Sequence, residues 1–143
     1  MDILPATPAD LDHWTAMREA LWPDEDGLRG GAEAMLANPD MLALIVHADG
    51  KPVAFAEAAL RRDYVNGCDT SPVAFLEGIY VEPEHRRSGV AQALANAAAE
   101  WGRAKGCTEF ASDILADNHE SHVFHTAIGF EETERVIYFR RVL

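Results

Sequence analysis

The stretch that most constrains the fold runs from residue 73 to residue 105, where the hydrophobic period changes from that of a strand to that of a helix. Residues 73–81 are a long, largely apolar run, which predicts a strand, and Gly78 inside it predicts a bulge or a close backbone approach. Residues 90–101 carry apolar side chains at helical spacing, and Gly106 stands where a helix would end. A strand that leads directly into an amphipathic helix is typical of an α/β domain.

Hydrophobic spacing and turn signals predict the other elements. They are a short strand at Ile3 and Leu4, helices over about 8–21 and 30–37, strands over 42–47 and 53–60 joined by the turn Asp49-Gly50, a strand over 108–113, a helix over 119–128 that ends at Gly129, and a final strand over 136–139. The resulting order is β-α-α-β-β-β-α-β-α-β. It predicts one mixed α/β domain over residues 1–143, with a central sheet flanked by helices.

The composition limits the class of protein. The chain has 143 residues, of which 48% are hydrophobic, enough for one sizeable core that needs neither a disulfide nor a structural metal. A formal net charge of -12 argues against nucleic acid as a partner and favours cationic small molecules, although acidity can also serve solubility alone.

Cysteine usage and hydropathy address the compartment. Cys68 and Cys107 lack metal-site spacing, so two incidental thiols in a reducing compartment are expected. No apolar run approaches the roughly 20 residues that span a bilayer, and the N-terminus lacks a basic segment before an apolar one. The sequence therefore predicts a cytoplasmic protein with no membrane segment.

The turn between the long strand and the following helix, residues 82–91, is basic and contains Gly89. A helix N-terminus presents unpaired backbone N–H groups and a positive dipole end, which suit a phosphate, and Gly89 and Ala91 allow the backbone to come close to it. Arg86 or Arg87 could add charge-assisted hydrogen bonds. The alternative is an ordinary first helical turn with solvated arginines.

Arg86, Gly89 and Ala91 match the pattern Arg/Gln-x-x-Gly-x-Gly/Ala, so the chain resembles the GNAT acetyltransferases. More narrowly, it resembles the aminoglycoside 6′-N-acetyltransferases. The segments that carry this second resemblance are LWP at 21–23, DYVNGCD at 63–69, FLEGI at 75–79, ASD at 111–113 and GFEETERVI at 129–137. The resemblance covers nearly the whole chain and implies a GNAT fold with acetyl-coenzyme A as co-substrate and a cationic aminoglycoside as acceptor.

The resemblance also implies roles for individual residues. Backbone groups of Ile79, Tyr80 and Val81 would face the pantetheine and thioester, and Asn118 would contact the cofactor. The pyrophosphate would be held by the turn, at Arg86, Arg87, Ser88, Gly89, Val90, Ala91 and Gln92. The aminoglycoside site would be lined by Trp22, Tyr64, Glu77, Asp113 and Glu134. Without the resemblance, Trp22 after a helix would be interpreted as a core residue.

Acetyl transfer to an amine requires a proton acceptor, because a primary alkylammonium with a pKa near 10.4 is mostly protonated at neutral pH. Glu77 lies on the long predicted strand beside the expected bulge, and Asp113 ends the neighbouring strand, so both could hold the ammonium and accept its proton. The alternative is a pair of strand-end carboxylates with no special partner. Backbone N–H groups of Gly78, Ile79 and Tyr80 are candidates for stabilising the thioester oxyanion.

His125 marks a departure from the family pattern, since many members have a tyrosine there that protonates the departing thiolate. Either His125 contributes, or water protonates the thiolate and His125 is a helix-packing residue. His119 and His122 share its helix at three-residue spacing, yet no metal is expected there.

The resemblance implies a homodimer, and the apolar run at 136–139 would then contribute to the interface, whereas in a monomer it would only complete the sheet. Two other functions stay open. One is a GNAT acetyltransferase for another amine, such as a polyamine or a protein N-terminus. The other is a non-catalytic module that binds coenzyme A or cations.

Overall fold

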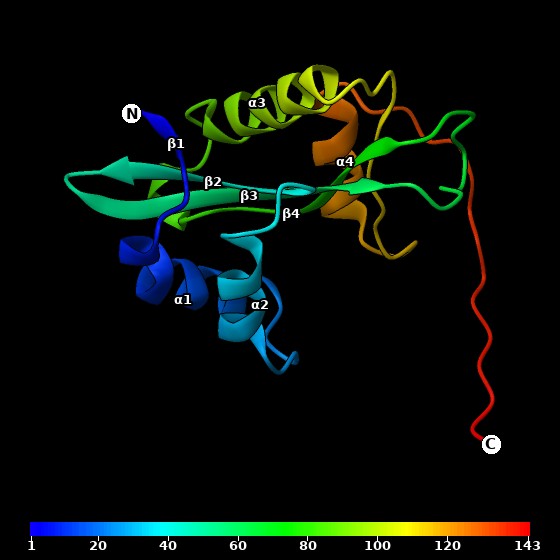
Figure 1. Cartoon of the computed structure of the whole chain (residues 1–143), viewed down its shortest axis with the longest axis horizontal. Coiled ribbons are helices and arrows are strands. Elements are labelled where there is room, and N and C mark those ends of the chain that lie inside the picture. Colours follow the sequence, from blue (N-terminus) through cyan, green and yellow to red (C-terminus); the bar gives the residue numbers. More distant parts are fainter.

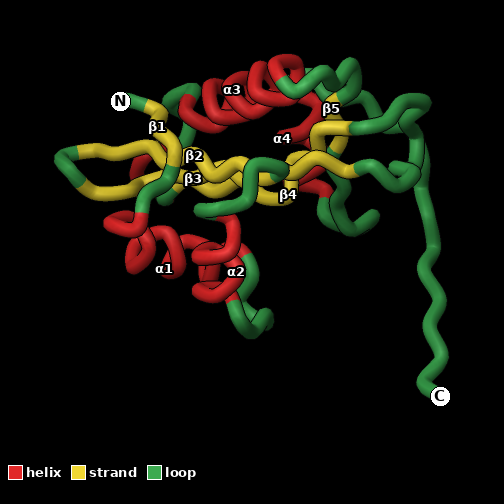
Figure 2. The backbone as a smooth tube through the Cα atoms, viewed as in Figure 1, coloured by secondary structure: helices red, strands yellow, loops and turns green.

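In the computed structural model, which describes all 143 residues, five strands form one sheet (Figures 1 and 2). Their spatial order follows the chain: β1 (Ile3–Pro5), β2 (Met41–Ala48), β3 (Lys51–Arg61), β4 (Val73–Val81) and β5 (Phe110–Ala111). Neighbouring strands are antiparallel except β4 and β5, which are parallel. The predicted mixed sheet is confirmed.

Helices cover both faces of this sheet (Figure 1). On one face lie α1 (Leu11–Leu21), which follows a 3₁₀ turn at Pro8–Asp10, and α2 (Leu28–Met35). On the other lies α3 (Val90–Ala104), preceded by a 3₁₀ turn at Pro83–His85, and α4 (His119–Ala127) follows β5. None of the helices combines the length and the apolar character that a membrane span requires.

Each face of the sheet has its own buried cluster. Leu94 of α3 packs against side chains of β2, β3 and β4 on one face, and Trp14 and Met17 of α1 pack against Ile45 and Phe55 on the other. Strand residues therefore alternate between two cores, as expected for a sheet covered on both sides.

Three predicted turns are confirmed by backbone angles that favour glycine or asparagine-like residues. Asp49 and Gly50 have φ values of 51° and 78°, as a two-residue hairpin turn requires, and they join β2 to β3. Gly106 after α3 and Gly129 after α4 have φ values of 89° and 101° and end these helices.

The bulge predicted from Gly78 is present in β4. Glu57 of β3 pairs with Gly78, but the next residue, Ala58, pairs with Leu76, so Glu77 is an extra residue in β4. Such a bulge bends the strand and redirects the side chain of the extra residue. Glu77 and the following Gly78 therefore both lie on the side of the sheet that α1 and α2 cover.

Two strand predictions are wrong, one in its length and the other in its existence. The strand expected over 108–113 is reduced to the two residues of β5, and the final strand expected over 136–139 is absent. The chain beyond α4 has no regular structure and extends away from the sheet (Figures 1 and 2). Residues 136–139 have the apolar side chains that are common in strands, but no strand of the same chain pairs with them.

The helix expected over 30–37 starts earlier, at Leu28. Gly27 adopts the left-handed conformation, with φ 71°, and serves as the N-cap residue. The helix therefore begins directly after the turn at residues 22–27.

Candidate active site

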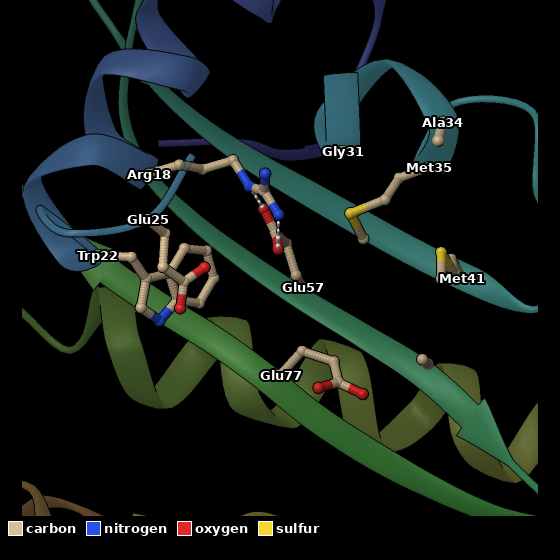
Figure 3. A pocket seen from close by; sticks show the side chains of 10 residues that line it. Arg18, Trp22, Glu25, Gly31, Ala34, Met35, Met41, Glu57 and Glu77 are labelled. Carbon is tan, nitrogen blue, oxygen red and sulfur yellow. Dashed lines mark hydrogen bonds and ion pairs between the residues drawn. The ribbon is translucent and has the colours of Figure 1, made fainter. Parts of the chain in front are cut away.

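A cavity of about 450 Å³ lies between α1, α2 and strands β2, β3 and β4 (Figure 3). This volume is within the usual range of small-molecule sites. Its lining combines ionisable side chains, namely Arg18, Glu25, Glu57 and Glu77, with Trp22, Gly31, Ala34, Met35, Met41 and Ala59. The cavity thus offers three carboxylates and an apolar wall to a ligand.

The deepest carboxylate in this cavity, Glu57, is part of a buried network. Arg18 Nε donates to Glu57 Oε1 at 2.7 Å and Arg18 Nη2 to Oε2 at 3.1 Å (Figure 3), while Trp14 Nε1 donates to Oε1 at 2.9 Å. Arg18 Nη1 also donates to the carbonyl of Leu28, the first residue of α2. Because only 2% of the Glu57 side chain is exposed, the network is a fixed part of the cavity floor.

Glu77 lies at the other side of the cavity, on the β4 bulge, and is more accessible. Both of its oxygens bind Arg61, with Arg61 Nη2 2.9 Å from Oε2 and 3.0 Å from Oε1. The Arg61 guanidinium also lies 3.4 Å from the ring centroid of Phe75. Glu25, by contrast, has no side-chain hydrogen bond or ion pair.

Trp22, at the C-terminal end of α1, forms one wall and rests on the bulge. Its ring centroid is 6.2 Å from that of Phe55, and the Arg18 guanidinium lies 5.1 Å from its ring. The indole is half-buried, so it both packs against the sheet and faces the cavity. The two interpretations of Trp22 from sequence, core residue and ligand platform, are compatible.

Gly78→Ala is expected to lower the free energy of unfolding by about 1–3 kcal/mol, because a Cβ there overpacks the site. That atom would lie 2.6 Å from Cζ2 and Cη2 of Trp22. Urea denaturation measures the loss. Gly30→Ala is the matched control, since nothing lies within 4 Å of its Cβ position. Equal stabilities of the two variants would contradict the described contact.

The basic turn at residues 82–91 forms a separate feature before α3. Arg87 and Gly89 both have left-handed φ values, 61° and 82°, and Ser88 Oγ donates to the carbonyl of His85 at 2.5 Å. Ala93 donates its N–H to Gly89, so the N–H groups of residues 90–92 have no acceptor within the helix. A Cβ at Gly89 would meet nothing within 4 Å, which leaves room for an anion.

The two arginines of the turn differ in their contacts. Arg86 Nε donates to the carbonyl of Val81 at 2.7 Å, and its guanidinium lies 5.5 Å from the Tyr80 ring. Arg87 is exposed and makes no side-chain hydrogen bond. Arg86 therefore holds the turn against β4 through its Nε, whereas no donor of the Arg87 side chain is engaged. Burial raises the pKa of Tyr80, and nearby Glu82 adds to that effect.

The strand residues expected at the cofactor, Ile79, Tyr80 and Val81, lie where β4 has separated from β5. The two strands pair only through Ala74 with Phe110 and Phe75 with Ala111. From residue 76 onward, β4 has no strand partner on that side. Ser112 Oγ donates to the carbonyl of Leu76 and Arg86 Nε to that of Val81, so the backbone that remains open to a ligand lies between these two carbonyls. Asn118 is the N-cap of α4, and its side chain accepts from the N–H of Ser121 at 3.1 Å.

Of the five residues expected at the acceptor, two line the cavity, Trp22 and Glu77. Asp113 is exposed just after β5, where continuation of the parallel register would place it opposite Glu77. Tyr64 is exposed in the loop after β3, and Glu134 lies in the extended C-terminal segment. These three residues do not line the cavity, and their roles stay predictions.

His125 is held by two serines. Its Nε2 lies 3.0 Å from Ser112 Oγ, and its Nδ1 lies 2.8 Å from the carbonyl of Ser121. The ring also packs against Phe130, with centroids 5.4 Å apart. The structure therefore gives His125 a packing contact, and no group of three or more metal-ligating side chains occurs around it or elsewhere.

The cavity beside a bulged strand and the anion-compatible turn before α3 agree with the comparison of the sequence with known families. A model of the acetyltransferase (GNAT) family matches residues 11–130. The chain belongs to this family. Its fold and its class of reaction, acetyl transfer, are those that the resemblance implied.

Several relatives match this acetyltransferase over its whole length. The aminoglycoside N(6′)-acetyltransferase type 1 of Salmonella typhimurium is 49% identical over 144 residues, which is 99% of each chain. The apo crystal structure of AAC(6′)-IG from Acinetobacter haemolyticus has a TM-score of 0.95 and 46% identity, covering 100% of this chain and 99% of that one. A structure of AAC(6′)-Iy with the bisubstrate analogue CoA-S-monomethyl-acetylneamine has a TM-score of 0.93 and 46% identity, covering 99% and 98%.

The sequence analysis did not identify three ionisable residues of the acetyltransferase's site, namely Arg18, Glu57 and Arg61. Glu57 carried a signal, because it is a carboxylate at an inward position of an otherwise apolar strand. Arg18 carried a weaker one, since it lies beside Trp14 and Met17 on the buried side of α1. Arg61 carried none, because its contact with Glu77 depends on the pairing register of β3 and β4.

Proposed function

We propose that the chain is an aminoglycoside 6′-N-acetyltransferase that moves the acetyl group of acetyl-coenzyme A to the 6′-amine by direct attack in a ternary complex, and that it confers antibiotic resistance. The observation that carries the proposal is the match, over the full length of the chain, to relatives named for this activity. The analogue bound to AAC(6′)-Iy joins coenzyme A to an aminoglycoside, which supports a single site for both substrates. An acidic cavity suits a polycationic acceptor.

In this proposal, the acceptor binds in the cavity beneath α1 and α2. Trp22 offers a flat surface to a sugar ring, and Glu25 and Glu77 offer counter-charge to its ammonium groups. Glu77 or Asp113 takes the proton from the attacking ammonium, directly or through water. The neutral amine then attacks the thioester carbon, a C–N bond forms as the C–S bond breaks, and the nitrogen loses its second proton. The departing thiolate takes a proton from water or from His125 and leaves as coenzyme A.

The donor is assigned to the other feature, the turn before α3. The N–H groups of residues 90–92 bind the pyrophosphate, Arg87 adds a charge-assisted bond, and Gly89 permits the close approach. Backbone groups of Ile79, Tyr80 and Val81 hold the pantetheine. Asn118, Arg86, Ser88 and Gln92 complete the predicted contacts. No acyl-enzyme is required, so neither cysteine is a nucleophile.

The test of this function is the release of thiol from acetyl-coenzyme A with different acceptors. A kanamycin-type aminoglycoside, spermidine and a peptide with a free N-terminus represent the three acceptor classes. We expect turnover with the aminoglycoside to exceed that with the other two. Preference for spermidine or the peptide would assign another amine, and no turnover with any acceptor would indicate a non-catalytic module.

We also infer that the protein acts as a homodimer in the cytoplasm. The apolar run at 136–139 has no strand partner in its own chain, and the Phe139 side chain is 92% exposed, which supports an interface with a second copy. A closed two-fold dimer would cover the run and bring Glu134 near a substrate cavity.

The proposed cytoplasmic location fits the cysteines. Cys68 and Cys107 are free thiols, as expected in a reducing compartment, and burial raises the pKa of the Cys68 thiol.

Ile137→Asp is expected to convert the dimer to a folded monomer, because it places a charge in the proposed interface. Sedimentation equilibrium at micromolar concentration measures the mass. Val123→Asp is the control, since it adds the same charge at an exposed apolar position on α4. A wild-type chain that sediments as a monomer would refute the dimer.

A further inference from the structure

The cavity contains two arginine–glutamate pairs that differ in burial. Arg18 and Glu57 have side chains that are 11% and 2% exposed, and Trp14 and the carbonyl of Leu28 complete their hydrogen bonds. Arg61 and Glu77 have side chains that are 42% and 33% exposed, and no other residue hydrogen-bonds to them. The first pair is fixed in the structure, whereas the second is open to exchange with solvent and solutes.

The two pairs determine which negative charges the free site offers to a ligand. Arg18 neutralises Glu57 and Arg61 neutralises Glu77, so Glu25 is the one lining carboxylate without a counter-ion. A cationic ligand that binds Glu77 through both oxygens must therefore replace the Arg61 guanidinium. Removal of the exposed pair costs little, because such pairs contribute about 0.2–1 kcal/mol.

We propose that Arg61 is the built-in counter-ion of Glu77 in the free enzyme, and that the ammonium of the acceptor displaces it. This inference rests on the proposed function, since it assigns Glu77 to the acceptor site. Arg61 then makes the site selective for cationic acceptors. A cation can form a new ion pair with Glu77 in place of Arg61, whereas a neutral group would break the Arg61–Glu77 pair without forming another. The Phe75 ring, 3.4 Å from the guanidinium, gives Arg61 a second contact that it can keep after the exchange.

The decisive variant is Arg61→Met, which removes the competing charge and keeps an unbranched apolar chain over Phe75. We expect the Kd for an aminoglycoside with a 6′-amine to fall by up to about fivefold, which corresponds to about 1 kcal/mol. The Kd for acetyl-coenzyme A stays unchanged. Isothermal titration calorimetry measures both constants on the full chain.

Arg62→Met is the matched control. Arg62 is the next residue, is exposed, and forms an ion pair with Asp40 at 2.7 Å, but it does not contact Glu77. A long-range effect of charge would tighten aminoglycoside binding in both variants, whereas displacement at Glu77 affects Arg61→Met alone. Equal effects of the two variants would overturn the inference.

A double-mutant cycle tests the contact itself. In a Glu77→Gln background there is no ion pair to break, so Arg61→Met is expected to leave the aminoglycoside Kd unchanged. If Arg61→Met still lowers the aminoglycoside Kd in the Glu77→Gln background, displacement is contradicted. If Arg61→Met raises the Kd in the wild-type background, displacement is also contradicted, and Arg61 is then a positioning residue. If the wild-type chain neither binds nor acetylates aminoglycosides, the proposed function fails instead.

Discussion

Glu77→Gln is expected to lower kcat by about 10²- to 10⁴-fold, the usual contribution of a general base. The substitution keeps the shape of the side chain on the β4 bulge but removes its ability to accept a proton. Because the turn before α3 is unchanged, the affinity for acetyl-coenzyme A should stay the same. Steady-state kinetics across pH, with calorimetry for the donor, measures both quantities.

Two comparison variants assign the roles of the acidic residues. Asp113→Asn is also expected to weaken turnover, and a lower kcat with an altered pH profile in only one variant identifies the base. Glu25→Gln should raise the acceptor KM with kcat unchanged, as expected for a carboxylate that only binds. Normal kinetics in both Glu77→Gln and Asp113→Asn would rule out the acidic residues as catalytic groups.

Gly89→Asp is expected to weaken acetyl-coenzyme A binding about 100-fold, because two like charges about 6 Å apart repel by about 2.8 kcal/mol at an effective dielectric constant of about 20. The carboxylate would enter the open space beside Gly89, next to the free N–H groups of α3. Calorimetric titration of the donor measures this loss.

The control for Gly89→Asp is Gly89→Asn, which has the same shape and the same tolerance of the left-handed conformation but no charge. We expect the asparagine variant to bind the donor much more tightly than the aspartate variant. Gly106→Asp adds a charge at the other end of α3, at another left-handed glycine, and should leave donor affinity unchanged. Equal donor affinities of the aspartate and asparagine variants at position 89 would remove the pyrophosphate from this turn.

Local signals in the sequence were sufficient for most of the fold. Asp49-Gly50 fixed the β2–β3 hairpin, because both residues adopt the left-handed conformation that this turn requires. Gly78 indicated the bulge, and the apolar spacing of residues 90–101 indicated α3. The final strand at 136–139 could not be judged in this way, because the pattern of apolar residues does not reveal whether a partner strand lies in the same chain.

The site was less accessible to sequence reasoning, because its ion pairs join distant parts of the chain. Arg18 and Glu57 meet because α1 crosses β3, and Arg61 meets Glu77 because β3 and β4 are neighbouring strands. Trp22 and Glu77 were identified through a resemblance to a family. From composition and spacing alone, Glu77 would have been described only as a carboxylate on a strand, and Trp22 only as an aromatic residue after a helix.

The most direct test of the central claim uses two aminoglycosides that differ only in a 6′-amine or a 6′-hydroxyl group. Each is incubated with acetyl-coenzyme A and the wild-type protein, while thiol release is followed and the product is examined by NMR. We expect thiol release only with the 6′-amine compound, and a product with the acetyl group on that nitrogen. Equal turnover of the two compounds, or acetylation at a different amine, would contradict a 6′-N-acetyltransferase.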